Sequence, residues 1–214
     1  MKTSPPKQFF TLIEIMVVIV IAAIMFGIGI PAFSTMIQGN TMTQAIRMTT
    51  AKIKAARAYA VANKCKVALL LPEKVTSKDH LSWSAYRVCV VDDSDAFVSW
   101  IDGEDWKTLP IGILRAGATS NNANAVTNTV NVNLPAGELI TGNVPAMIFK
   151  KNGQLANDYE IGFWHGRVVE ENPIWTQKRV DNDTKFKVAV SKYTGKTTIT
   201  DPNEKEEAST PPAN

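Results

Sequence analysis

The sequence of 214 residues has few of the side chains on which metal sites and catalytic centres depend. It contains two cysteines and two histidines, and neither His80 nor His165 has ligand-type neighbours at the short spacing of a zinc site. It also lacks a glycine-rich phosphate loop and any motif that pairs a nucleophile with a base. We therefore expect a protein that is not an enzyme and that holds no metal or other cofactor.

One acidic stretch, DDSDAFVSWIDGED at residues 92–105, invites a calcium interpretation. An EF-hand loop needs alternating oxygen ligands, a central glycine and a terminal glutamate, and this spacing is not met. We interpret these acids as solvated loop residues. The net charge of +3 is too small to predict nucleic-acid binding by itself.

Charge is absent from a long run near the N-terminus. Between Ile15 and Phe33 no side chain is charged or forms hydrogen bonds, and one carboxylate, Glu14, stands at the edge of this run. About 20 apolar residues span a bilayer as a helix, so the run predicts a transmembrane segment. Lys2 and Lys7 precede it, which predicts that the N-terminus lies in the cytoplasm and the remainder outside it. A cleaved secretory signal is the alternative, but the run is long for one and no A-x-A-like site closes it.

Helical character is predicted to continue beyond this run. No glycine or proline occurs between Gly39 and Pro72, and an apolar stripe recurs at helical spacing, made of Ile46, Ile53, Ala56 and Ala60. Pro31 is expected to kink the helix without ending it, because lipid-embedded helices tolerate proline. The basic residues off the stripe are Arg47, Lys52, Lys54, Arg57, Lys64 and Lys66. They form either a solvated face or a contact surface for a partner or an anionic polymer.

After about residue 63 the pattern changes to strands separated by turns. CKVALLLP and YRVCVV are rich in β-formers, and turn signals stand at 102–103, 152–153 and 194–195. The predicted fold class is α+β, with a long hydrophobic helix at residues 10–64 packed on an antiparallel β-sheet domain at residues 65–200. Residues 201–214 are polar, and we expect a disordered tail.

The two cysteines lie in the first two predicted strands. If these strands pair as a hairpin centred near Ser77, Cys65 lies opposite Cys89. An oxidising compartment outside the membrane would permit a disulfide between them. A disulfide and two buried free thiols both remain open.

The segment FTLIEIMVVIVIAAI, residues 10–24, followed by Pro31, resembles the N-terminus of type IV pilins and of the pseudopilins of type II secretion. The stretches AIRMTTAKIKAARAYAVANKCKVAL, MIFKKNGQL and KVAVSKYTGKTTI are similar to the GspH/FimT branch of minor pilins and minor pseudopilins. The resemblance covers roughly residues 9–70 and two C-terminal stretches. It implies a pilin-like fold and a structural subunit of a type II secretion pseudopilus or a type IV pilus.

The resemblance also implies a route of processing and assembly. Residues 1–9 would be a leader, which a prepilin peptidase removes between Phe9 and Phe10, and the new amine of Phe10 would be methylated. Before assembly the subunit would be a single-pass protein of the inner membrane, and it would then join other pilin or pseudopilin subunits in an envelope filament. Glu14 would pair with the amine of a neighbouring subunit and set the axial register. The family has glycine before the cut where this chain has Phe9, so either a variant peptidase acts or the chain is cut poorly or not at all.

A different class of function is a permanently membrane-anchored binding module, either an adhesin or a DNA-uptake receptor. Its contacts would come from the basic helix face or from KKNG at residues 150–153 and SKYTGK at residues 191–196. A secreted substrate or DNA would then be the partner, and DNA binding would weaken steeply with salt.

Overall fold

The computed structural model describes residues 12–73, 81–116, 126–132, 140, 142–171, 174–179 and 186–200, without the side chains of 28–39, 170–171 and 174–179. The chain divides into two units, Met1–Asn40 and Thr41–Asn214. The helix α1, Leu12–Asn63, is continuous and contributes to both. The predicted leader, residues 1–9, and the predicted tail, residues 201–214, lie outside the described residues.

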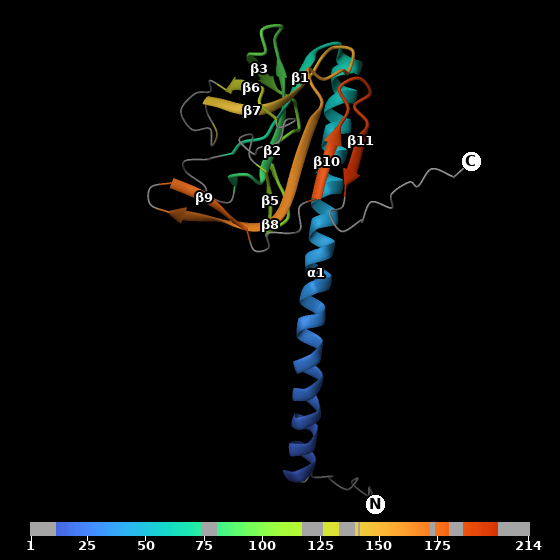
Figure 1. Ribbon diagram of the computed structural model, residues 1–214, viewed down its shortest axis with the longest axis vertical. Helices are drawn as coiled ribbons and strands as arrows, with labels where there is room; N and C mark the ends of the chain where they lie inside the picture. The colour runs from blue at the N-terminus through green and yellow to red at the C-terminus, as the bar shows by residue number, and fades with distance from the viewer. Residues whose placement is uncertain are drawn as a thin grey trace, which may run out of the picture. The chain divides into compact units, whose positions relative to one another are not determined.

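The first sheet of the second unit is antiparallel and has the strand order β3-β2-β1-β7-β6 (Figure 1). The short strand β4 also pairs with β2. The strands are β1 (Lys66–Leu70), β2 (Ala85–Val91), β3 (Phe97–Trp100), β4 (Lys107–Thr108), β6 (Thr129–Val132) and β7 (Gly142–Phe149). Its two outermost strands, β3 and β6, contact each other. The sheet therefore curls toward closure.

The second sheet is also antiparallel, with the order β11-β10-β8-β5 and with β9 paired to β8. Its strands are β5 (Ile113–Arg115), β8 (Tyr159–Glu171), β9 (Ile174–Arg179), β10 (Phe186–Val190) and β11 (Thr197–Thr200). The first part of β8 pairs with β10 and β5, and its last six residues pair with β9. The predicted combination of one long helix with antiparallel strands is confirmed.

The main core lies where the C-terminal part of α1 meets both sheets. The predicted stripe is confirmed, because Ile46, Ile53, Ala56 and Ala60 are at most 5% exposed. These side chains join a cluster that includes Val67 and Leu69 of β1, Phe149 of β7, Phe163 of β8 and Val188 of β10. The stripe thereby sets how α1 is rotated about its own axis relative to the sheets.

A second core fills the opposite face of the first sheet. It contains Ala68 and Leu70 of β1, Cys89 of β2, Val130 of β6 and Ile148 of β7. The central strand β1 is thus buried on both faces, and this explains why its sequence is continuously apolar instead of alternating.

Both cysteines are free thiols, and their predicted register is wrong. The strands β1 and β2 do pair, but Cys89 lies opposite Ala68, three positions away from Cys65. Cys89 belongs to the second core, whereas Cys65 packs against the first core on the other face of the sheet. Burial raises the pKa of the Cys89 thiol to about 12, so this thiol stays protonated near neutral pH.

Candidate functional site

Glu14 lies in the first turn of α1 as described, within an apolar helical surface. Twelve large apolar side chains around it are 52–78% exposed in the single chain: Leu12, Ile13, Ile15, Met16, Val17, Val18, Ile19, Val20, Ile21, Ile24, Met25 and Phe26. A helix that is apolar on every side is normally buried by lipid or by other protein. The surface around Glu14 is therefore a candidate contact surface.

The charges near Glu14 in sequence are few. Glu14 is the only acidic residue before Glu73, and no charged residue follows it until Arg47. The helix thus offers Glu14 no basic side chain at three or four residues' distance, where helical ion pairs form. The basic groups closest in sequence are Lys2, Lys7 and the amine at the start of the chain.

The remaining predicted residues of this segment are only partly described. Phe9 and Phe10 lie outside the described residues. Pro31 lies inside α1, which continues on both sides of it, and its side chain is among those not described. The kink at Pro31 stays a prediction.

Among the described residues, no helical stretch is both long enough and apolar enough to cross a bilayer. The predicted run, residues 15–33, extends beyond Gly27, after which side chains are not described.

A second candidate site lies in the globular unit, where Arg57 of α1 reaches two tight turns. Its Nε donates a hydrogen bond to the carbonyl oxygen of Gly153 at 3.1 Å. Gly195, in the turn between β10 and β11, approaches so closely that a Cβ there would lie 2.7 Å from Arg57 Cδ. Both glycines have positive φ, 78° and 62°. The Arg57 side chain therefore fixes the helix against the two turns that the sequence predicts at 152–153 and 194–195.

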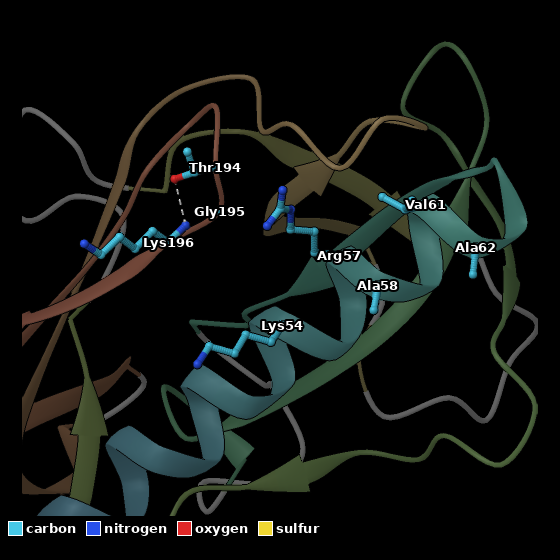
Figure 2. Close-up of a pocket in the computed structure, with 8 residues that line it drawn as sticks. All are labelled: Lys54, Arg57, Ala58, Val61, Ala62, Thr194, Gly195 and Lys196. Carbon is cyan, nitrogen blue, oxygen red and sulfur yellow. Dashed lines mark hydrogen bonds between the residues drawn. The ribbon is translucent and has the colours of Figure 1, made fainter.

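A groove of about 690 Å³ opens beside this contact. We call it the cationic groove, and its lining is Lys54, Arg57, Ala58, Val61 and Ala62 of α1 together with residues 194–196. Figure 2 shows Arg57 extending from the helix toward the turn that contains Gly195. In that turn the Lys196 backbone N–H donates a hydrogen bond to Thr194 Oγ1 at 3.1 Å, drawn as a dashed line. Three cations and three small aliphatic side chains thus line one opening.

The other residues of the predicted basic face have separate roles. Lys52 of α1 forms an ion pair with Glu104, and Lys66 of β1 pairs with Asp95 at 2.8 Å. These two ion pairs link α1 and β1 to the acidic stretch of residues 92–105. Arg47 and Lys64 are exposed. The predicted basic face is therefore divided between internal ion pairs, exposed residues and the cationic groove.

The acids of residues 92–105 stabilise turns and ion pairs. Asp92 Oδ1 accepts hydrogen bonds from Ser94 N, Ser94 Oγ and Ala96 N at 2.7–2.9 Å, and the bond from the Ser94 side chain is the main cause that lowers the Asp92 pKa. Asp93 pairs with Lys151 at 3.1 Å. Within the described ranges, no three acidic, histidine or cysteine residues group as metal ligands.

Sequence reasoning found the two glycine turns and the basic helix face but missed that they meet. Arg57 and Gly153 are 96 residues apart, and no motif links them. The available signal was the presence of lysines beside both turns, in KKNG and SKYTGK. Those lysines indicated a basic surface without indicating that Arg57 would reach it.

No family model matches the chain, and no curated protein matches it. Among solved structures, the chain is similar in fold to the type IV minor pilin FimU of Pseudomonas aeruginosa, with 10% identity over 77% of this chain and 92% of that chain and a TM-score of 0.44. It is also similar to the minor pseudopilin EpsH from the type 2 secretion system of Vibrio cholerae, with 9% identity over 77% of this chain and 98% of that chain and a TM-score of 0.43.

The contact between Arg57 and Gly195 yields a prediction about stability. Gly195→Ala places a Cβ at positive φ, which costs about 1–2 kcal/mol, and also forces Arg57 to move, which adds about 1–3 kcal/mol. Gly103→Ala is the matched control, because Gly103 has φ of 75° and a Cβ added there would meet no atom within 4 Å. In urea unfolding of the full chain in detergent, Gly195→Ala should lower the free energy of unfolding more than Gly103→Ala does.

The double variant with Arg57→Ala separates the two costs. Without the Arg57 side chain, the additional loss caused by Gly195→Ala should fall to that of Gly103→Ala. An unchanged penalty in the Arg57→Ala background would contradict the proposed contact.

Proposed function

We propose that this chain is a structural subunit of an envelope filament, a minor pseudopilin or minor pilin, held in the inner membrane by its N-terminal helix before assembly. The observation that carries the proposal is the apolar surface of Leu12–Phe26, exposed all round in the single chain and interrupted by one carboxylate. The FTLIE motif at residues 10–14 supports it. No catalytic step and no cofactor form part of the proposal.

An apolar helix of this kind has two environments that remove its surface from water. Lipid covers it in the membrane, and the equivalent helices of other subunits cover it in a filament. Each large side chain among the twelve contributes about 1.5–3 kcal/mol when it is fully removed from water. Transfer from lipid to a helix bundle keeps most of this contribution, and packing between helices then favours the assembled state.

The role proposed for Glu14 follows from the cost of a carboxylate in these surroundings. On insertion scales an acid at the centre of a membrane helix costs about 2.5–3.5 kcal/mol, and this value is an upper bound for Glu14 at the edge of the apolar run. Cleavage after Phe9 would remove Lys2 and Lys7 with the leader and create an amine at Phe10. Pairing of Glu14 with the Phe10 amine of a neighbouring subunit would offset the cost and would set the axial register, because the carboxylate and that amine meet at one offset between the two helices.

The alternative is a permanently anchored binding module that keeps its leader. The cationic groove favours some anionic contact, but it does not distinguish a filament subunit from a fixed receptor. The state of the N-terminus does distinguish them, because only the filament pathway needs the cut.

Mass spectrometry of the N-terminus of the native protein provides the first test. The filament role predicts a mature chain that begins at Phe10 and carries one methyl group on its amine. A chain that begins at Met1, with Phe9 and Phe10 still joined, would favour the fixed anchor and contradict the proposed assembly.

The second test replaces the carboxylate. Glu14→Ala should leave the subunit in the membrane fraction, because it makes the helix more apolar, and should lower its amount in sheared filaments at least about tenfold, as expected from a loss of about 1.4 kcal/mol. Lys107→Gln, at an exposed lysine of β4 outside the apolar surface, is the control and should assemble normally. Immunoblots of membrane and filament fractions measure both. Normal incorporation of Glu14→Ala would refute the role of Glu14.

A further inference from the structure

The strand β11 is an open edge of the second sheet. It pairs with β10 on one side, and on its other side no described strand pairs with it. Its residues, Thr197, Thr198, Ile199 and Thr200, include no charge and no proline, and the last three are exposed. Natural proteins usually protect such an edge with a charge, a proline or a covering element. Neither a charge nor a proline lies within Thr197–Thr200, and threonine and isoleucine favour β-strands.

The hydrogen bonds of the turn show which backbone groups of β11 point away from β10. The Ser191 N–H donates to the Lys196 carbonyl at 3.0 Å, and the Ser191 carbonyl accepts from the Gly195 N–H at 2.8 Å, so Ser191 is the last hydrogen-bonded position of the ladder, with Gly195 and Lys196 opposite it. Bonded pairs alternate with non-bonded pairs in an antiparallel ladder, so Thr198 and Thr200 bond to β10. The N–H and C=O groups of Thr197 and Ile199 therefore face outward, where an additional strand would pair.

The cationic groove lies at the turn end of this edge, since Lys196 lines the groove and Thr197 begins β11. The groove contains Lys54 and Lys196, neither of which has an acidic partner among the described residues. The described contacts of Arg57 use its Nε and leave its two Nη groups without a partner in the described part of the chain. The groove therefore favours an anionic group, and Ala58, Val61 and Ala62 favour an aliphatic group beside it.

We propose that this region binds an extended acidic segment of a partner protein. The segment adds a strand to the outer edge of β11 and places a carboxylate, with an aliphatic neighbour, in the cationic groove. Two independent features select this class of partner. The outward amides and carbonyls of Thr197 and Ile199 are complementary to another extended backbone, and the three cations are complementary to a carboxylate. The proposal does not depend on the filament role, because a fixed membrane protein would present the same edge.

A nucleic acid is the competing occupant. It would satisfy Lys54, Arg57 and Lys196 through its phosphates, but it has no extended peptide backbone to pair with β11. The two occupants therefore differ in their dependence on the edge amides, and the experiment uses that difference.

The probe is a fluorescent peptide, acetyl-Glu-Leu-Thr-Val-Thr-Leu-Glu-amide, which carries an acid and an aliphatic residue at both ends and so fits either strand direction. Fluorescence anisotropy measures its binding to the full chain in detergent. The glutamate peptide should bind at least about tenfold more tightly than its glutamine version. N-methylation of alternate peptide amides, which leaves the charges unchanged but blocks strand pairing, should also weaken binding at least about tenfold.

Variants of the protein test the same two contacts. Ile199→Pro removes an outward N–H and should weaken binding at least about tenfold, while Ile199→Thr keeps that N–H and should bind as the unchanged protein does. Lys54→Gln combined with Lys196→Gln should abolish the preference for glutamate, and Lys107→Gln, an exposed lysine on β4, should not change it. If Ile199→Pro does not fold, the N-methylated peptide still tests the edge.

Three results would overturn the proposal. The first is the absence of peptide binding up to about 1 mM, which corresponds to less than about 4 kcal/mol of affinity. The second is equal binding of the peptide and its N-methylated form. The third is tighter binding of a 20-nucleotide single-stranded DNA, lost in the double lysine variant but unchanged in Ile199→Pro, which would assign the groove to a polyanion.

Discussion

The burial of one helical stripe, Ile46, Ile53, Ala56 and Ala60, holds the globular unit together. These side chains contact both sheets, and they leave α1 only one rotation about its axis. Successive helical residues are about 100° apart, so this rotation also decides where the polar residues lie. It brings Arg57 to the glycine turns and places Lys54 beside the cationic groove. The packing of the core thus positions the charged surface.

The same helix changes character along its length. From Thr41 onward the stripe is narrow, and the chain's own sheets cover it. Among residues 12–27 the large apolar side chains are exposed on every side. A helix with a narrow apolar stripe can bury that stripe against a single domain. A helix that is apolar on every side needs lipid or other helices to remove its surface from water. The part of α1 from Thr41 onward meets the first requirement within this chain. In the proposed function, lipid and then other subunits meet the second requirement for residues 12–27.

Local patterns in the sequence predicted much of this fold. The stripe followed from helical spacing, and the turns at Gly103, Gly153 and Gly195 followed from dipeptides that favour positive φ. The register of β1 and β2 did not follow, because residues 71–84, which join them, contain no tight-turn signal that would set the offset. A hairpin centred near Ser77 would place Cys65 opposite Cys89, whereas the residue opposite Cys89 is Ala68.

Contacts between distant parts of the chain were the least predictable. The bond between Arg57 and Gly153 joins residues 96 apart, and the pairing of Lys52 with Glu104 joins residues 52 apart. A basic helix face and an acidic loop can each be read from composition, but which members meet depends on how the sheets pack against the helix. The open edge at β11 was also not predictable from the sequence, because a strand pattern does not show whether the strand pairs on one side or on both.

Carbodiimide crosslinking of isolated filaments tests the pairing of Glu14 most directly. This reagent joins a carboxylate to an amine only when the two are in contact, and the ion pair of Lys66 with Asp95, at 2.8 Å, is an internal positive control within each chain. We predict a covalent dimer in which mass spectrometry finds Glu14 of one chain linked to the Phe10 amine of another. If the Lys66–Asp95 link forms while Glu14 stays unlinked, or links only within its own chain, the proposed pairing between subunits is wrong.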